Sequence, residues 1–372
     1  MDSFDMPRSV APRLSTEPIN VLSHLLLSPV GVDPSLSPLV TELQNITEEN
    51  FKSLVALAHS NHVIVRALEI VRSMMLDTKD DLRAHWAATA IAAERARILR
   101  AIRFLDTICV AFDEAGLDVT VIKSLDHWPD LGSDLDLYTS APAHVVCDLM
   151  ERRFGAQVAS RSWGDRLAGK WNFNLPELPE SVEFHIQRLG QTGEQLVLAS
   201  RLPQRARSFQ MEGHTFHVPS ASDRLMISTL QRMYRHFYFR LCDIIDTATL
   251  ADAGEVDYEE LRSSAQACGI WEGVATYLVI VSDYVRQYRS AGLQLPKFVT
   301  DSSRFSGNVV YFSRGFLRVP ILPQSVGLYR SQMMGLLRKR ELQSSARLGL
   351  LPWLASAAAI GHKITGSDKG IW

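Results

Sequence analysis

Residues 121–138 carry the side chains with the clearest chemical potential. Asp134 and Asp136 are separated by Leu135 and followed by Leu137, so polar and apolar residues alternate. In a β-strand alternate side chains share a face, so the two aspartates point one way and the leucines point into a core. Carboxylates about 6–7 Å apart on one strand face repel each other. A bound divalent cation is the usual remedy, and Mg²⁺ prefers carboxylates together with substrate phosphates.

A third acid follows in a second alternating segment, residues 181–187. There Glu183 lies on the polar face together with His185. If this strand lies beside the Asp-x-Asp strand, Glu183 joins the two aspartates. Three carboxylates can hold two metal ions, which clamp the attacking and leaving oxygens of an in-line phosphoryl displacement. We therefore predict that Asp134, Asp136 and Glu183 are the catalytic residues and the metal ligands. His185 is interpreted as a hydrogen-bonded residue of the cleft wall, with metal ligation as the second-ranked alternative.

The run Gly132-Ser133 followed by Asp-Leu-Asp-Leu resembles the signature of the DNA polymerase β-like nucleotidyltransferases. The wider frame is an apolar strand ending in Lys123, a short loop, the Asp-x-Asp strand and, much later, Glu-x-His. That frame is similar to the bacterial "uncharacterised nucleotidyltransferase" family, and the resemblance covers roughly residues 85–290. A helix holding His236, Arg240, Asp243 and Asp246 also resembles the post-catalytic helix of this family.

The resemblance implies an Mg²⁺-dependent transfer of a nucleoside monophosphate from an NTP to an acceptor, with pyrophosphate leaving. In better-known relatives the Gly-Ser pair lies further upstream of the first aspartate, and here Lys123 and Ser124 occupy that slot. The residues expected to bind the nucleotide are thus Lys123, Ser124, Ser133 and Arg240. For Arg240, a surface ion pair is an equally weighted alternative to a phosphate contact.

Two other functions compete with this interpretation. A glycosyltransferase can use a metal-bound Asp-x-Asp, but it normally needs a larger nucleotide-binding unit before the motif, and Glu183 would be unexplained. A non-catalytic interaction protein on the same scaffold is the other alternative, although all three acids are present. The sequence does not name the acceptor, which could be a small molecule, a sugar, a protein side chain or an RNA end.

The composition is that of a globular protein. The chain has 372 residues, of which 46% are hydrophobic and 22% charged, so a largely disordered chain is excluded. The four cysteines lie far apart and contain no C-x-x-C pair, which argues against both a disulfide scaffold and a zinc cluster. No apolar run reaches the ~18 residues of a membrane span, and the N-terminus is acidic where a signal peptide would be basic. We therefore predict a cytoplasmic protein without a transmembrane segment.

Hydrophobic periodicity predicts an α+β fold, in which a small mixed-sheet catalytic unit is flanked by N-terminal and C-terminal helical regions. Helical spacing dominates before residue 115 and again from Asp223 to about Leu250, which is interpreted as one helix. Short β-branched and alternating segments lie between these regions. The predicted units are a loose arm (1–35), a helical region (36–115), the catalytic domain (116–220), a C-terminal helical domain (221–292) and a basic tail with a short apolar segment (293–372).

Charge is distributed unevenly along the chain. From residue 281 onward 13 Lys and Arg face 4 Asp and Glu, a net charge of +9, which leaves −11 on residues 1–280. We expect the tail to dock on the acidic catalytic body, with membrane contact through a basic and apolar helix as the second-ranked alternative. The acidic body disfavours broad nucleic-acid binding, whereas the basic tail leaves a local site open.

Overall fold

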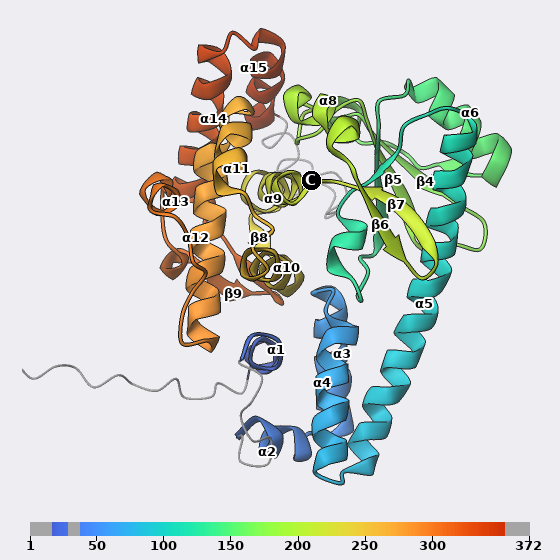
Figure 1. Cartoon of the computed structure of the whole chain (residues 1–372), viewed down its shortest axis with the longest axis vertical. Coiled ribbons are helices and arrows are strands. Elements are labelled where there is room, and N and C mark those ends of the chain that lie inside the picture. Colours follow the sequence, from blue (N-terminus) through green and yellow to red (C-terminus); the bar gives the residue numbers. More distant parts are fainter. Residues whose placement is uncertain (1–16, 29–37, 354–372) are drawn as a thin grey trace, which may run out of the picture.

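The computed structural model describes residues 17–28 and 38–353. Helices and a small mixed sheet build an α+β fold, as predicted. Figure 1 shows the sheet between a long helix on one side and the C-terminal helices on the other. The N-terminal helices are α1 (Pro18–Leu27), α2 (Pro38–Gln44), α3 (Glu48–Ser60), α4 (Ile64–Asp77) and α5 (Asp81–Glu114).

The central sheet has five strands in the order β1-β2-β5-β4-β3. Strands β2 and β5 run parallel, whereas the other neighbours are antiparallel. The apolar residues of β2 and β5, such as Leu135, Leu137 and Phe184, are completely buried, as their alternation requires. The strands are β1 (Thr120–Val121), β2 (Asp134–Thr139), β3 (Gln157–Val158), β4 (Lys170–Asn174) and β5 (Ser181–Ile186).

Helix α5 joins the N-terminal helices to the sheet. Its 34 residues extend about 50 Å at 1.5 Å per residue, so one half packs on α4 and the other reaches the sheet. At the sheet end the ring of Phe112 stacks on Phe184, with centroids 5.1 Å apart. The remaining elements of this region are η2 (Ser124–His127), α6 (Ala143–Phe154), α7 (Trp163–Ala168), α8 (Leu196–Arg205) and the separate hairpin β6 (Arg207–Met211) and β7 (His214–Val218).

The single helix predicted from Asp223 to Leu250 is wrong. Helix α9 (Ala221–Thr229) continues into the π-helical turn η3 (Leu230–His236), which ends at Phe237 with a left-handed φ of 55°. The chain then forms the short strand β8 (Tyr238–Phe239) before α10 (Leu241–Asp252) begins. Strand β8 pairs with a strand more than 70 residues later, a long-range contact that periodicity does not reveal.

Two segments that were predicted as a loose arm and a basic tail fold onto the rest of the described chain. Residues 18–27, expected within a loose arm, form α1, whose Leu22 is completely buried and whose Ser23 hydroxyl is 2.7 Å from that of Tyr284. Residues expected in the tail form α13 (Lys297–Ser302), η4 (Gly307–Val309), β9 (Tyr311–Ser313), β10 (Phe316–Arg318), η5 (Ile321–Ser325), α14 (Val326–Arg338) and α15 (Leu342–Gly349). These elements join the helical region of α11 (Tyr258–Ala267) and α12 (Trp271–Tyr288): α13, η4 and α14 contact α12, and β10 pairs with β8.

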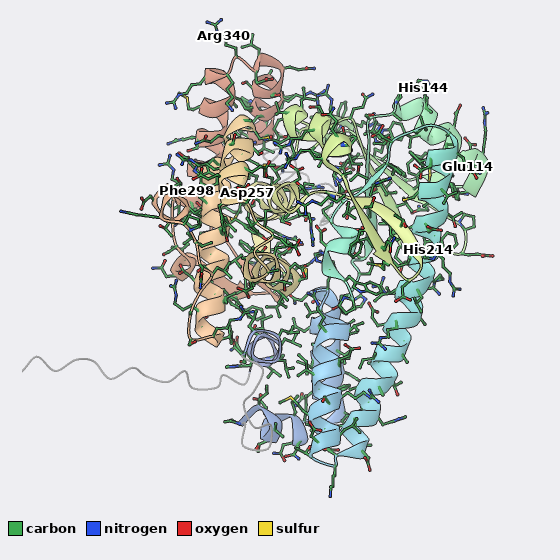
Figure 2. All side chains as sticks on the ribbon, in the orientation of Figure 1. Glu114, His144, His214, Asp257, Phe298 and Arg340 are labelled. Carbon is green, nitrogen blue, oxygen red and sulfur yellow. The ribbon has the colours of Figure 1, made fainter. Side chains whose placement is uncertain are left out.

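The described part of the predicted tail docks on the chain itself. The Arg347 guanidinium donates to the carbonyl of Leu167 in the catalytic unit at 2.8 Å. The basic run at 338–340 is exposed, and Arg340 lies at the outer end of α14 (Figure 2). Most of the apolar segment Leu348–Ile360 lies outside the described residues. Within the described ranges, no helix combines the length and the apolar character needed to cross a membrane.

The contact between α5 and the sheet can be tested by truncating its central ring. Because Phe184 is completely buried between Phe112 and Phe173, we expect Phe184→Ala to lower the free energy of unfolding by about 3–5 kcal/mol. Urea denaturation followed by circular dichroism measures this loss. Trp163→Ala removes a ring that is 76% exposed and serves as the control, with a change within about 0.5 kcal/mol. Equal losses in the two variants would contradict the packing argument.

Candidate active site

The register between β2 and β5 brings two of the predicted acids together. Asp136 lies directly beside Glu183 in this parallel pair, and neighbouring strands are about 4.8 Å apart. One ligand atom from each of Asp136, Glu183 and His185 lies within 4.8 Å of the others. Asp134 begins β2 and is exposed, so its carboxylate stands at the rim of the same face. The polar faces of the two strands therefore form one acidic centre.

This acidic centre opens into a cavity of about 170 Å³. All seven predicted site residues line it, namely Lys123, Ser124, Ser133, Asp134, Asp136, Glu183 and Arg240. Gly132 and His236, which belong to the motifs of the family resemblance, line it as well. The structure adds further lining residues that were not predicted from the sequence: His62, His127, Lys170, Gln231, Arg232, Arg235 and Tyr238. The cavity thus combines three carboxylates with a larger number of basic side chains.

Two lysines neutralise the carboxylates in the centre. The Lys123 ammonium contacts Asp136 and lies 3.7 Å from Oε1 of Glu183, and the Lys170 ammonium contacts Glu183 as well. Burial lowers the pKa of Lys170 to about 8, although Glu183 acts in the opposite direction. His185 completes the group, with Nε2 2.8 Å from Oε1 of Glu183.

The environments of Asp134 and Glu183 shift their pKa values in opposite directions. Although Asp134 is exposed at the rim, the surrounding protein partly desolvates its carboxylate, and this effect, followed by repulsion from Asp136 and Glu183, raises the pKa of Asp134. Burial would also raise the pKa of Glu183, but Lys170 and His185 outweigh it and hold this pKa well below its ordinary value. Among the described residues Asp134 makes no ion pair, so it is the least compensated acid of the centre.

Lys123 and Ser124, which were predicted to face the phosphates, lie in a sharp turn after β1. Lys123 adopts a left-handed backbone with φ of 63°, a conformation that costs a non-glycine residue on the order of 1 kcal/mol. Ser124 is buried, and its hydroxyl accepts a hydrogen bond from the backbone N–H of Asp136 at 2.7 Å. The Lys123 side chain thereby reaches the acidic centre, while the Ser124 side chain ties this turn to β2.

The opposite wall of the cavity is basic and comes from η3 and the start of α10. Arg232 is 1% exposed, and its Nε lies 2.7 Å from Oδ2 of Asp243. The same carboxylate oxygen accepts a hydrogen bond from the backbone N–H of Arg240 at 2.7 Å. Arg240 is the residue directly before α10, so the prediction that it lies within a helix is wrong. The Arg240 guanidinium lies 6.0 Å from the centre of the Tyr238 ring. Asp243 therefore positions two cavity arginines at once.

Arginines from the N-terminal helices hold the strands that carry the acids. Arg97 of α5 donates to the carbonyl of Leu131 just before β2 at 3.0 Å and to Glu180 just before β5 at 2.8 Å. Arg66 of α4 pairs with Asp130 and Asp246, which connects the loop before β2 to α10. Buried ion pairs of this kind fix geometry, because a displaced partner would leave an uncompensated charge.

Some of the missed residues left a signal in the sequence, and others did not. Lys170 and Asn172 alternate with Trp171 and Phe173, and Lys170 is the register partner of His185. Alternation alone could therefore have assigned Lys170 to the polar face. Arg232, by contrast, faces the cavity because η3 is π-helical and the chain turns at Phe237. The 3.6-residue periodicity of an α-helix does not predict a π-helical turn.

A family model described as "Uncharacterised nucleotidyltransferase" matches residues 47–286, well over half of the chain. The chain belongs to this nucleotidyltransferase family. The predicted resemblance is thereby confirmed, and the match includes every residue that lines the cavity.

A solved structure described as an antigenic nucleotidyltransferase-like protein from Paracoccidioides brasiliensis shares 13% identity with the chain. The comparison covers 54% of this chain and 95% of that one, with a TM-score of 0.32, and a similarity this low carries no argument. No curated protein matches the chain.

The donor set of the acidic centre fits a hard divalent cation. Asp134, Asp136 and Glu183 offer carboxylate oxygens, which are the ligands that Mg²⁺ prefers. Desolvation and, after it, repulsion from Asp136 and Glu183 raise the pKa of Asp134, and a bound cation would relieve the repulsion. Lys123 and Lys170 already compensate the inner carboxylates, so the rim aspartate gains most from a cation.

The low pKa of Lys170 predicts a pH-dependent stability. Between pH ~8, where folded Lys170 loses its proton, and pH ~10.4, where an unfolded lysine does, the unfolded state binds more protons. The contribution of Lys170 to the free energy of unfolding should therefore rise with pH across this window. We expect the difference between wild type and Lys170→Met to shift in favour of wild type from pH 8 to pH 10.

Urea unfolding in metal-free buffer at each pH measures this difference. Lys52→Met removes an exposed lysine of α3 and is the control for the loss of one positive charge. A difference between wild type and Lys170→Met that stays constant or falls between pH 8 and pH 10 would show that burial of Lys170 carries no such penalty.

Proposed function

We propose that this family member is an Mg²⁺-dependent nucleotidyltransferase that transfers a nucleoside monophosphate from an NTP to an acceptor and releases pyrophosphate. The observation that carries the proposal is the shared cavity, in which three acids face a wall of arginines in a chain of this family. The acids suit a metal–phosphate complex, and the arginines suit the charge of a triphosphate.

Asp134, Asp136 and Glu183 are the proposed metal ligands. Mg²⁺ bound to them would neutralise charge on the transferred phosphoryl group and on the leaving pyrophosphate. Glu183 has a pKa well below its ordinary value, and such a carboxylate is a weak proton acceptor. We therefore propose Glu183 as a ligand and not as the base that activates the acceptor.

The basic side chains are the proposed binding groups for the phosphates. Lys123 would contribute from the turn after β1, and Arg232, Arg235 and Arg240 from the opposite wall. Guanidinium groups form charge-assisted and often bidentate hydrogen bonds to phosphate oxygens. Ser133 directly precedes β2, lines the same cavity, and offers a hydroxyl and a backbone N–H. The oxygen of the acceptor hydroxyl would attack the α-phosphorus as its proton passes to water, while the bond to the pyrophosphate oxygen breaks.

The acid variants test this function directly. Each of Asp134→Asn, Asp136→Asn and Glu183→Gln removes one negative charge from the centre, and we expect each to lower the turnover rate by at least ~10³-fold, equivalent to several kcal/mol. The assay incubates the protein with Mg²⁺, each labelled NTP and a cell extract, and follows label transfer and pyrophosphate. Asp148→Asn changes an exposed aspartate of α6 and should retain full activity. Turnover at the wild-type rate by any acid variant would refute its assigned role.

A variant of a cavity arginine tests nucleotide binding separately from the chemical step. Arg235 is part-buried and lines the cavity, and the loss of a charge-assisted hydrogen bond costs about 1.5–3 kcal/mol. We expect Arg235→Ala to raise the KM for the NTP about 10- to 100-fold. Arg152→Ala removes an exposed arginine of α6 and is the matched control. An unchanged KM in Arg235→Ala would place the triphosphate elsewhere.

A further inference from the structure

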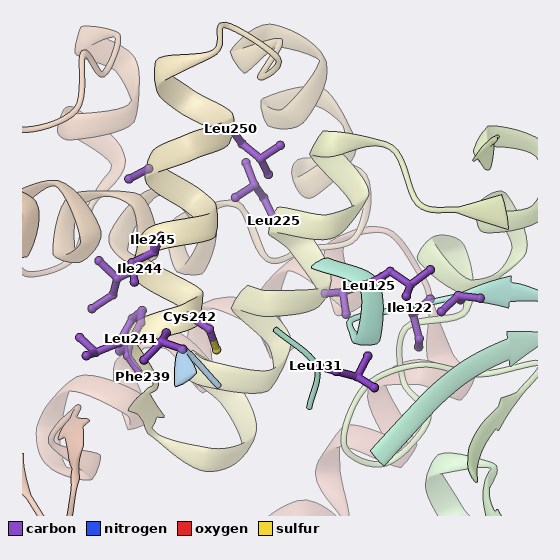
Figure 3. Packing of buried hydrophobic residues seen from close by; sticks show 14 of the residues in the cluster. Ile122, Leu125, Leu131, Leu225, Phe239, Leu241, Cys242, Ile244, Ile245 and Leu250 are labelled. Atoms are coloured by element: carbon purple, nitrogen blue, oxygen red, sulfur yellow. The ribbon is translucent and has the colours of Figure 1, made fainter. Parts of the chain in front are cut away.

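A second cluster of metal-ligating side chains lies beside the acidic centre. His62 follows α3, His127 ends η2, and Cys242 is the second residue of α10. One ligand atom from each lies within 4.8 Å of the other two, and all three residues are buried. His62 and His127 also line the wall of the cavity. Figure 3 shows Cys242 on α10 among the apolar side chains Leu241 and Ile244.

The spacing within this cluster fits a tetrahedral metal ion. Nε2 of His127 lies 3.8 Å from Sγ of Cys242. Tetrahedral bonds of about 2.0 Å to nitrogen and 2.3 Å to sulfur place those two atoms roughly 3.5 Å apart. The thiol–imidazole contact therefore needs to close by only about 0.3 Å to hold zinc.

The neighbouring side chains orient the histidines as ligands. Nδ1 of His127 is 2.5 Å from Oδ2 of Asp246, so this nitrogen donates to the carboxylate and Nε2 is left to face Cys242. Metal-bound histidines generally have this carboxylate partner. His62 is 8% exposed, and its Nδ1 has no hydrogen-bond partner in the described part of the chain. A buried nitrogen without a partner is costly unless a ligand satisfies it.

The local charges leave room for a divalent cation. Arg66 pairs with both Asp130 and Asp246, so these three groups carry one net negative charge. A Cys242 thiolate would add a second. Arg232 is already paired with Asp243 and does not compensate this charge. Arg240, whose charge acts on His62, adds one positive charge, so a divalent ion would leave this neighbourhood with one net positive charge.

We propose that His62, His127 and Cys242 bind one zinc-class metal ion, with its fourth position open toward the cavity. Two nitrogens and one sulfur are a soft set, which selects zinc or cobalt over the magnesium that suits the acidic centre. Three protein ligands with one open position are typical of zinc sites that bind water or substrate. The ion would also connect the junction of α3 and α4 with η2 and α10. This inference does not depend on the proposed nucleotidyl transfer.

Cobalt(II) provides a direct probe, because thiolate ligation gives an intense near-ultraviolet charge-transfer band that carboxylates cannot produce. The full chain is reduced, stripped with a chelator and titrated with cobalt(II) in the presence of excess Mg²⁺. We expect the band to saturate at about one equivalent and to decrease when zinc is added. Asp136→Asn should retain the band, because the acidic centre contains no sulfur. The band thus reports on this cluster even if no nucleotide is transferred.

Variants locate the site and control for folding. Cys242→Ser should abolish the charge-transfer band, whereas Cys268→Ser, which changes another buried cysteine, should preserve it. Asp246→Asn should weaken cobalt affinity about 10- to 100-fold through loss of the carboxylate behind His127. Circular dichroism verifies that each variant is folded. Absence of the band in folded wild type, or an undiminished band in Cys242→Ser, would overturn the proposal.

Discussion

The parallel register of β2 and β5 is the constraint on which the rest of the site depends. It places the Asp136 carboxylate beside that of Glu183, with Asp134 two residues away on the same face. Strand geometry keeps these carboxylates close together, because alternate side chains share a face and neighbouring strands are only about 4.8 Å apart. Positive charge must therefore come from elsewhere in the chain. Lys123 supplies it from a left-handed turn, and Lys170 from the neighbouring strand β4.

The structure supplies this compensation by joining distant parts of the chain. Arg97 of α5 connects the segments that precede β2 and β5, so the long helix fixes the starting points of both acidic strands. On the opposite wall Asp243 holds Arg232 and the backbone of Arg240. The C-terminal segment contributes to this wall, because β10 pairs with β8 directly before Arg240. A cavity that concentrates both signs of charge is consistent with the proposed substrate, a nucleoside triphosphate with its metal ion.

The acidic centre and the His62–His127–Cys242 cluster share one cavity but offer different chemistry. The first presents hard carboxylate oxygens, whereas the second presents imidazole nitrogens and a thiol. Arg66 and Asp246 connect the second cluster to α4 and α10, and Asp130 connects it to the loop that leads into β2. A shift of α10 would therefore move His127, which lines the cavity.

The sequence by itself determined the α+β class, the family resemblance and the residues of the acidic face. Period-two alternation is a local property, so the strands around Asp134, Asp136 and Glu183 could be predicted closely, and it would also have indicated Lys170. Only the tertiary structure decided that these strands are neighbours, that the helix predicted after Asp223 breaks at Phe237, and that residues 18–27 and 297–349 pack on the body. Any two of His62, His127 and Cys242 are separated by more than 50 residues in the sequence, and the three residues share no local sequence pattern. Their proximity depends on long-range packing, because the free energy that holds them together comes from contacts between elements and not from any one segment.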